Sequence, residues 1–226
     1  MSKTYAIIPA RGGSKGLANK NIRSFGGKPL LVHSIDYALS SNLVDAVFVS
    51  TDDKKIMETA KNAGANIIHR PTELASDTAT TESAIHHFIE SCNEKPNTIV
   101  LLQATSPLRP KGSLDDALNH FHNEKFDSLL SICPTHRFFW RVKKDKTTFA
   151  EYDFKNRPRR QDLKPIDMRF MENGSLYIFT REHFENTGNR LGGKIGFVEW
   201  PEHFSLEIDT ALDFQLSELI FSSLNP

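Results

Sequence analysis

Apolar runs and amphipathic stretches alternate along the first two-thirds of the chain. Short runs rich in Ile, Val, Leu and Phe have the length of buried strands, and the stretches between them carry apolar residues at helical spacing. The expected strands cover residues 4–9, 46–50, 66–69, 98–103 and 128–133. The expected helices cover residues 30–40, 52–63, 82–92 and 113–124. This alternation predicts an α/β fold with a doubly wound, mostly parallel sheet that helices cover on both faces.

Two of the expected helices begin with recognisable signals. Asp52 is expected to cap the N-terminus of the second helix, and Gly64 ends that helix. At the fourth helix, Ser113 and Asp116 have the spacing of a capping box. Both signals predict that these side chains cap helices rather than bind a ligand.

The alternating pattern breaks between residues 136 and 171. This stretch begins near an aromatic run, Phe138-Phe139-Trp140, and continues with polar and basic residues that have little apolar periodicity. Regular structure is expected to resume with strands at 174–179 and 196–200 and a final helix at 210–224. We therefore expect a single domain, residues 1–226, into which residues 136–171 are inserted as an arm. The arm is expected to bury its aromatic side chains against a second subunit in a homodimer.

Composition narrows the class of protein. The chain has 226 residues, and its 28 Lys and Arg balance its 28 Asp and Glu, so the formal net charge is 28 − 28 = 0. A neutral chain argues against general nucleic-acid binding, and no apolar stretch approaches the ~18 residues of a membrane helix. Cys92 and Cys133 form no cluster that would bind zinc, and two thiols in a chain of this length favour a reducing compartment. The expected location is the cytoplasm.

The neutral total conceals two segments of opposite charge. Residues 1–35 contain six Lys and Arg and not one acid, whereas residues 199–226 contain six acids and not one Lys or Arg. These segments are interpreted either as two solvated faces or as two halves of a site that binds a polyphosphate and its metal ion.

A glycine-rich, basic segment follows the first expected strand, at the edge where open α/β sheets bind ligands. Residues 10–21 read ARGGSKGLANKN. The glycines let backbone N–H groups approach an anion, and Arg11, Lys15 and Lys20 add positive charge. The spacing fits neither the phosphate loop of ATPases nor the dinucleotide fingerprint. The segment is interpreted as a phosphate-binding loop or as a glycine-rich turn with solvated lysines.

Three further candidate sites follow later in the chain. Arg70 and the hydroxyl-rich residues 74–81 could hydrogen-bond a base or a ribose, or form an ordinary polar loop. Gln103 ends the most apolar strand and is expected to face a ligand. Glu207 and Asp209 share one face of an extended segment, where two carboxylates suit Mg²⁺; in the alternative, Asp209 only caps the last helix.

Five motifs in a fixed order resemble those of the acylneuraminate cytidylyltransferases, the CMP-sialic acid synthetases. They are residues 7–16 (IIPARGGSKG) with Lys20-Asn21, 101–109 (LLQATSPLR), 157–162 (RPRRQD), 172–177 (ENGSLY) and 207–210 (EIDT). Each motif is short, but their ordered combination is specific, and together they extend over nearly the whole chain.

The resemblance implies a nucleotide-diphospho-sugar-transferase-like fold with a small dimerisation arm. It implies an enzyme that joins CTP to a nine-carbon 2-keto sugar acid and releases pyrophosphate with the help of Mg²⁺. By similarity, the catalytic residues are Arg11, Lys15, Lys20 and Asp209. The residues that would bind the nucleotide are Ala10, Arg11, Gly12, Gly13, Ser14, Lys15, Asn21, Arg70, Ala79 and Thr81. Those that would bind the sugar acid are Gln103, Thr105, Ser106, Arg159, Arg160, Asn173 and Tyr177, and the metal ligands would be Glu207 and Asp209.

The chain departs from the family's pattern at three positions. Ala104 stands in the family's Gln-Pro-Thr-Ser-Pro motif, Glu207 stands where Asp is common, and Met171 precedes the ENGSLY motif. The sugar acid is therefore left open among sialic, legionaminic and pseudaminic acids. The alternatives are a cytidylyltransferase for an eight-carbon acid, a sugar-nucleotide-dependent glycosyltransferase, and a nucleotide-binding module without activity.

Overall fold

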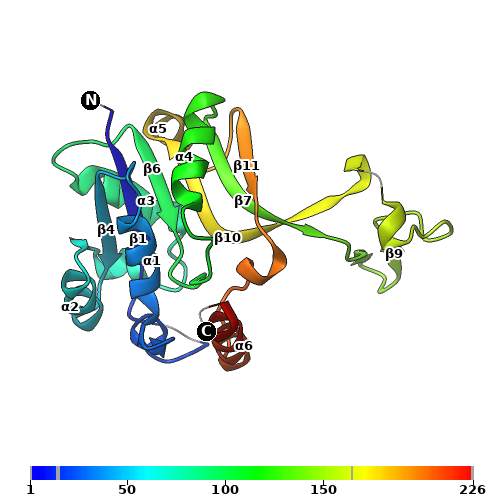
Figure 1. Ribbon diagram of the computed structural model, residues 1–226, viewed down its shortest axis with the longest axis horizontal. Coiled ribbons are helices and arrows are strands. Elements are labelled where there is room, and N and C mark those ends of the chain that lie inside the picture. Colours follow the sequence, from blue (N-terminus) through cyan, green and yellow to red (C-terminus); the bar gives the residue numbers. More distant parts are fainter. Residues whose placement is uncertain (1, 14–15, 164, 225–226) are drawn as a thin grey trace.

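A mostly parallel sheet of seven strands forms the centre of the molecule (Figure 1). The computed structural model describes residues 2–13, 16–163 and 165–224. The strand order is β11-β7-β10-β6-β1-β4-β5, and neighbouring strands are parallel except where β10 pairs with β6 and β7. The strands of this sheet are β1 (Thr4–Pro9), β4 (Ala46–Thr51), β5 (Asn66–His69), β6 (Thr98–Leu102), β7 (Ser128–Thr135), β10 (Arg169–Thr180) and β11 (Ile195–Glu199).

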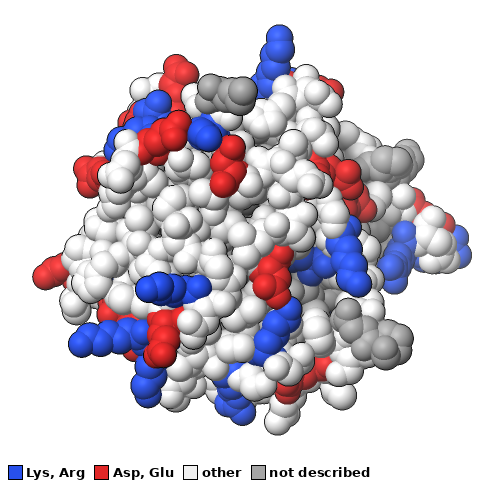
Figure 2. All heavy atoms as spheres, turned by 60° about the vertical axis from the view of Figure 1, so that its left-hand side comes forward, with Lys and Arg blue, Asp and Glu red and all other residues white. Residues whose placement is uncertain are grey.

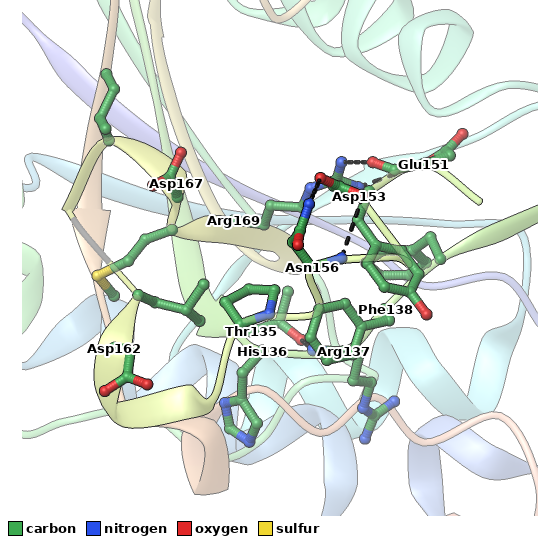
Figure 3. A pocket seen from close by; sticks show the side chains of 16 residues that line it. Thr135, His136, Arg137, Phe138, Glu151, Asp153, Asn156, Asp162, Asp167 and Arg169 are labelled. Carbon is green, nitrogen blue, oxygen red and sulfur yellow. Dashed lines mark hydrogen bonds and ion pairs between the residues drawn. The ribbon is translucent and has the colours of Figure 1, made fainter.

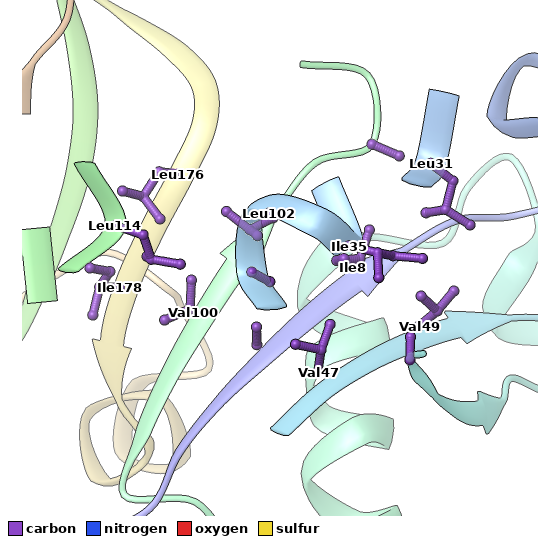
Figure 4. Packing of buried hydrophobic residues seen from close by; sticks show 14 of the residues in the cluster. Ile8, Leu31, Ile35, Val47, Val49, Val100, Leu102, Leu114, Leu176 and Ile178 are labelled. Carbon is purple, nitrogen blue, oxygen red and sulfur yellow. The ribbon is translucent and has the colours of Figure 1, made fainter. Parts of the chain in front are cut away.

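Helices cover both faces of the sheet, which confirms the predicted doubly wound fold. Because successive residues of a strand point to opposite faces, β1 sends Ile8 to one layer and Ile7 to the other, and both are fully buried. The first layer joins the sheet to α1, α2 and α4 (Figure 4), and the second joins it to α3 and α5. These helices are α1 (Leu30–Leu39), α2 (Lys54–Asn62), α3 (Thr81–Ser91), α4 (Ser113–Asn123) and α5 (Arg181–Thr187).

The last helix, α6 (Ala211–Leu224), packs against the N-terminal part of the chain. Its Phe214 shares a small core with Leu17 and Phe25. Phe25 lies in the hairpin of β2 (Ser24–Phe25) and β3 (Lys28–Pro29), which turns at Gly26 with a φ of +54°. A Cβ at Gly26 would lie 2.3 Å from the Phe221 ring, so this turn requires glycine for both its conformation and its close approach. The packing holds the acidic C-terminal segment beside the basic N-terminal loop.

β7 and β10 continue beyond the body of the molecule as a two-stranded ribbon with a small tip at its far end (Figure 1). The tip contains the antiparallel strands β8 (Trp140–Val142) and β9 (Thr148–Ala150). The insertion expected at residues 136–171 corresponds to this tip and to the first residues of β10. Its role in dimerisation stays a prediction.

Two expected helix caps are wrong. Asp53, not Asp52, caps α2, because its Oδ1 accepts hydrogen bonds from two N–H groups of the first turn at 2.8 and 2.9 Å. Asp52 instead accepts a hydrogen bond from the backbone N–H of Gly12 at 3.0 Å. The N-cap of α4 is Gly112, which has left-handed backbone and no capping side chain, so Ser113 lies inside the helix rather than at its cap. In both places the backbone path, which the pattern of residue types does not specify, decides which residue occupies the cap.

Charged side chains are mixed over the face of the molecule shown in Figure 2. Acidic and basic residues are scattered there around a largely uncharged centre, and among the residues described neither sign forms a continuous patch on this face. Within the described part of the chain, no helix is long and apolar enough to cross a membrane.

Candidate active site

A pocket of about 410 Å³ opens at the carboxyl ends of β1 and β6. Its lining brings together both ends of the chain and its middle. Seven of the lining residues are candidates from the sequence: Arg11, Lys20, Asn21, Thr81, Gln103, Thr105 and Asp209. Pro9, Gly16 and Ala104 complete it. The basic and acidic segments therefore meet in one place, rather than forming two separate solvated faces.

Lys20 joins the two ends of the chain. It begins a short 3₁₀ helix, η1 (Lys20–Ile22), and its Nζ donates to the carbonyl oxygen of Ile208 at 2.7 Å and to Oδ1 of Asp209 at 3.1 Å. Only 12% of the Lys20 side chain is exposed, so this lysine is more enclosed than a solvated loop residue. Gly16 approaches the same segment, because a Cβ there would lie 2.2 Å from the carbonyl oxygen of Asp209. Any other residue at position 16 would push the loop away from the acidic segment.

The first half of the glycine-rich loop is held by side chains from several directions. The buried Asn21 donates from Nδ2 to the carbonyl oxygen of Arg11 at 3.0 Å. The Arg11 guanidinium pairs with Asp77 at 2.8 Å, and the Gly12 N–H is held by Asp52. Among the other predicted nucleotide-binding residues of the loop, Ala10 is buried and Gly13 is exposed. Ser14 and Lys15 lie outside the described residues.

Arg70 is not among the residues that line the pocket. Its side chain is buried, and its Nε has no hydrogen-bond partner among the described residues. Burial lowers the pKa of Arg70; the charge of Asp52 opposes this effect and that of Arg11 adds to it. Of the other two residues predicted for the base, Thr81 begins α3 and lines the pocket, whereas Ala79 lies in the preceding loop outside the lining.

Gln103 and Thr105 line the pocket from the loop that follows β6. The Thr105 hydroxyl donates to Oε1 of Gln103 at 3.4 Å, so the two side chains lie together. Ser106, predicted beside them, is buried, and its hydroxyl has no partner within the described part of the chain. Ser106 therefore lies outside the wall that Gln103 and Thr105 form.

Arg109, the last residue of the 101–109 motif, supports the loop that follows β6, although the sequence predicts no individual role for it. Its guanidinium is buried and donates to the carbonyl oxygens of Gln103 at 2.8 Å and Ser175 at 3.1 Å, and to the Ser34 hydroxyl at 2.9 Å. Burial lowers the pKa of Arg109 to about 10, so it remains a cation near neutral pH. It ties the loop after β6 to β10 and so fixes the backbone from which Gln103 projects. Two signals in the sequence pointed to Arg109: it ends the 101–109 motif, and it lies just beyond an apolar strand.

Asn173 and Tyr177, both on β10, are buried and do not line the pocket around Lys20. Both ends of the buried Asn173 amide are engaged: Oδ1 accepts from the Ser131 hydroxyl at 2.5 Å, and Nδ2 donates to the Ser205 hydroxyl at 3.2 Å. Tyr177 is also buried, and its hydroxyl donates to Glu172. Burial raises the pKa of Tyr177 and the carboxylate of Glu172 raises it further, so the phenol stays a hydrogen-bond donor. Contact of these two residues with a sugar acid stays a prediction.

The two predicted metal ligands have different surroundings. Glu207 turns against β10, where a Cβ on Gly174 would lie 1.7 Å from its Oε1. Loss of solvation raises the pKa of Glu207, and the negative charges of Asp209 and Glu172 act in the same direction. The Asp209 side chain is 69% exposed and lines the pocket. Crowded carboxylates repel each other, and a cation placed beside them would relieve that repulsion.

The alternative in which Asp209 only caps the last helix is wrong. Thr210 and Asp213 form a reciprocal cap: Thr210 Oγ1 accepts from the Asp213 N–H at 3.2 Å, and Asp213 Oδ2 accepts from the Thr210 N–H at 2.7 Å. The carboxylate of Asp209 therefore takes no part in this cap; it pairs with Lys20 and lines the pocket. Over residues 2–13, 16–163 and 165–224, no group of three or more His, Cys, Asp and Glu side chains gathers as a metal site. Glu207 and Asp209 suit Mg²⁺, which commonly takes one or two carboxylates and completes its shell with substrate phosphates and water.

The two arginines predicted to reach a partner's site lie on the arm. Arg159 pairs with Asp162 at 2.6 Å, and Arg160 begins the short helix η3 (Arg160–Asp162). Neither lines the pocket around Lys20. The tip has a pocket of its own, of about 530 Å³, whose walls include Phe138 and Glu151 (Figure 3). Within one chain, Arg159 and Arg160 therefore lie apart from the candidate site.

Relatives of known name align with most of this chain. It is 36% identical over 217 residues to the N-acylneuraminate cytidylyltransferase of Oncorhynchus mykiss and 32% identical over 217 residues to that of Streptococcus agalactiae serotype III. These alignments cover 94% of this chain but only 49% and 52% of the two relatives. The chain thus spans about half the length of the curated relatives it matches.

Solved structures share the fold. The structure of CMP:2-keto-3-deoxy-manno-octonic acid synthetase complexed with CTP matches with a TM-score of 0.75 at 16% identity, over 99% of this chain and 100% of that one. The 4-diphosphocytidyl-2C-methyl-D-erythritol synthase of Anaerococcus prevotii matches with a TM-score of 0.68 at 12% identity, over 98% and 99% of the two chains. At these identities the likeness concerns the fold alone, and it confirms the predicted fold class. A protein-family model described as cytidylyltransferase matches residues 5–197, which include the glycine-rich loop and most of the pocket, and the chain belongs to that family.

Proposed function

We propose that this protein transfers cytidylate from CTP to a nine-carbon 2-keto sugar acid of the sialic type and releases pyrophosphate. The observation that carries the proposal is the contact of Lys20 with Ile208 and Asp209, which joins the basic glycine-rich loop to the acidic C-terminal segment at one pocket. Phosphoryl transfer depends above all on positioning and on the stabilisation of charge, and the two segments supply both signs of charge. Membership of the cytidylyltransferase family and the relatives named N-acylneuraminate cytidylyltransferase support the choice of nucleotide and acid.

In the proposed reaction, the hydroxyl on the anomeric carbon of the sugar acid loses its proton and attacks the α-phosphorus of CTP. The bond between that phosphorus and the bridging oxygen breaks, and pyrophosphate leaves. Arg11, Lys20 and the backbone N–H groups of the glycine-rich loop hold the phosphate oxygens, and Gln103 and Thr105 orient the acid beside them. Glu207 and Asp209 would hold Mg²⁺, which when bound neutralises phosphate charge and lowers the pKa of the attacking hydroxyl.

Magnesium is expected to bind well only when nucleotide is present. In the pocket Lys20 already pairs with Asp209 at 3.1 Å, and the described residues form no cluster of three or more metal-binding side chains. Phosphate oxygens would draw Lys20 away and supply the missing ligands, so Mg²⁺ affinity should rise at least about 10-fold when a non-hydrolysable CTP analogue is bound. Isothermal titration calorimetry with and without the analogue measures this. Lys20→Met should strengthen Mg²⁺ binding without nucleotide, whereas equally tight binding by the wild type in both conditions contradicts the expectation.

We propose further that the protein is a homodimer in which each arm lies over the partner's pocket. The arm exposes large apolar side chains, among them Val142 at 71% and Ile166 at 88% exposure, which a second copy would bury. Residues 136–171 contain 11 Lys and Arg against five Asp and Glu, whereas residues 199–226 contain six acids and neither Lys nor Arg. The arm of one copy is therefore complementary in charge to the acidic segment of the other. In that arrangement Arg159 and Arg160 would meet the carboxylate of the sugar acid.

Light scattering coupled to size-exclusion chromatography tests the dimer. The wild type should elute as a dimer at micromolar concentration, and the double variant Trp140→Glu, Val142→Glu should be a monomer of reduced activity. Leu43→Glu changes an exposed leucine on the body of the molecule and should leave the dimer intact. A fully active wild-type monomer would rule out the proposed assembly.

The proposed location is the cytoplasm. Cys92 and Cys133 are both buried free thiols. Free thiols are usual in reducing compartments, and neither cysteine is needed for the proposed chemistry. CTP, the sugar acid and the metal ion are the only other partners that the proposal requires.

A substrate panel tests the proposed function. Pyrophosphate release is measured with CTP, UTP, ATP and GTP against nine-carbon and eight-carbon 2-keto sugar acids. We expect release only with CTP and a nine-carbon acid. A preference for the eight-carbon acid would overturn the proposed substrate, and CTP binding without turnover of any acid would favour a binding module.

A further inference from the structure

We infer that Arg190 contacts the sugar acid and selects it through a neutral acceptor oxygen, a hydroxyl or an amide carbonyl, at a distance from the anomeric carbon. The inference rests on the proposed function, because it names a specificity residue for the same pocket. Arg190 lies outside every sequence motif that pointed to the site.

The position of Arg190 brings its charge beside the pocket wall. It lies in the loop between α5 and β11, and its guanidinium carbon is 4.5 Å from the centre of the Tyr177 ring. The same guanidinium pairs with Glu82 in the first turn of α3. Glu82 directly follows Thr81, which lines the pocket. Arg190 therefore spans the distance from β10 to the edge of the candidate site.

A continuous polar strip leads from Arg190 to the sugar-acid side of the pocket. Beneath Arg190, the Tyr177 hydroxyl donates to Glu172. Glu172 lies two residues before Gly174 on β10, and the Oε1 of Glu207 lies against Gly174. The Nε2 of Gln103 approaches the same point, 3.7 Å from where a Cβ of Gly174 would lie. Each member of the strip is thus near the next, and the strip ends at a residue that lines the pocket.

The contacts of Arg190 hold its N–H groups in place before a ligand binds. Its side chain is 21% exposed, and its buried Nε has no hydrogen-bond partner within the described part of the chain. Stacking on Tyr177 and pairing with Glu82 fix the plane of the guanidinium, which reduces the entropy lost when it binds an acceptor. Because Glu82 already balances its charge, the pair offers N–H donors with little net charge. Such a group favours a hydroxyl or an amide carbonyl over a second carboxylate.

In this arrangement Tyr177 positions Arg190 and does not itself contact the sugar acid. Tyr177 is buried beneath the guanidinium and donates to Glu172, so it acts as a positioning residue for Arg190. The Arg190 side chain is 21% exposed, whereas Tyr177 is buried. A substrate that approaches from the pocket would therefore meet Arg190 before it meets the ring of Tyr177.

Steady-state kinetics of Arg190→Met and Arg190→Lys test the inference. The probes are two nine-carbon 2-keto acids that differ at one substituent, an acylamido group in one and a hydroxyl in the other. Arg190→Met should raise KM for the preferred acid by about 10- to 100-fold, the usual effect of losing a hydrogen bond from a charged donor. It should leave KM for CTP within about 2-fold and reduce the discrimination between the two acids. Arg190→Lys, which keeps the charge and the pair with Glu82, should lie between wild type and Arg190→Met.

Arg181→Met is the matched control. Arg181 also forms an arginine–glutamate pair, with Glu185 at 2.7 Å, but it donates to the Pro96 carbonyl at the opposite end of β6. Its kinetics should match those of the wild type. An equal loss of activity by Arg190→Met with both acids, together with a lower melting temperature, would show a structural role and overturn the inference. Unchanged KM for the acid would overturn it as well, while the proposed function would stand. A wild type that turns over neither acid would instead overturn the proposed function, and the inference with it.

Discussion

Replacement of Lys20 by alanine is expected to lower kcat/KM for CTP by at least about 100-fold, the usual cost of losing one preorganised charge donor. Its ammonium lies between the carbonyl oxygen of Ile208 and the carboxylate of Asp209, at the point where the basic loop meets the acidic segment. Arg11 also lines the pocket, but its guanidinium pairs with Asp77 at 2.8 Å rather than with Asp209, so it does not replace Lys20 at this point. The effect should appear in both KM and kcat, because the charge on the phosphates is present in the ground state and is redistributed as pyrophosphate leaves.

Thermal unfolding separates this effect from a loss of structure. Lys20 is mostly enclosed, so its removal should destabilise the protein by about 1 kcal/mol, the typical net contribution of a hydrogen bond. Lys28→Ala is the matched control, since Lys28 lies in the same basic segment but pairs with Asp36 at the surface. That control should keep wild-type activity. Wild-type turnover in a folded Lys20→Ala protein would exclude the proposed role in binding phosphate.

Replacement of Asp209 by asparagine is expected to reduce activity by at least about 100-fold while stability hardly changes. Asparagine keeps the shape of the side chain but lacks the charge that a divalent cation needs. The pair with Lys20 is too exposed on the Asp209 side to contribute much to folding. Thr210 and Asp213, not Asp209, cap the last helix, so the helix should be unaffected.

Two variants in the same segment serve as controls. Glu207→Gln should cost less activity than Asp209→Asn, because Glu207 lies against Gly174 and its longer side chain would reach a metal ion through water. Asp213→Ala should lower the melting temperature by removing the helix cap, a loss of about 1 kcal/mol. Measurements of activity as a function of Mg²⁺ concentration and of melting temperature distinguish the three variants. Normal Mg²⁺ dependence in Asp209→Asn would place the metal site elsewhere.

The strands of the sheet and the edge that holds the site could be predicted from the sequence. Runs such as residues 99–102 (IVLL) are apolar throughout because both faces of the sheet are covered, and such runs are distinctive. Ligands of open α/β sheets bind beyond the carboxyl ends of strands, which is where Arg11, Gln103 and Lys20 come together. The opposite charges at the two ends of the chain allowed either two solvated faces or one shared site, and the contact of Lys20 with Asp209 decides for the shared site.

Other features could not be predicted, for physical reasons. β10 enters the sheet antiparallel between β6 and β7, and no local pattern encodes which neighbours a strand will have. α5 has seven residues, of which only Phe184 is buried, so its periodicity is too weak to recognise. Asp52 and Asp53 are both good capping residues, and only the backbone path decides between them. The Arg190–Glu82 pair joins positions 108 residues apart, a contact that exists only in the folded chain.

The central claim is tested most directly by identifying the product of a reaction that contains the protein, CTP, Mg²⁺ and a nine-carbon 2-keto sugar acid. Phosphorus NMR and mass spectrometry should detect a phosphodiester that joins cytidylate to the anomeric oxygen of the acid. That product should form together with an equal amount of pyrophosphate and only when all the components are present. CTP that stays intact, or pyrophosphate that forms equally well without the acid, would contradict the account.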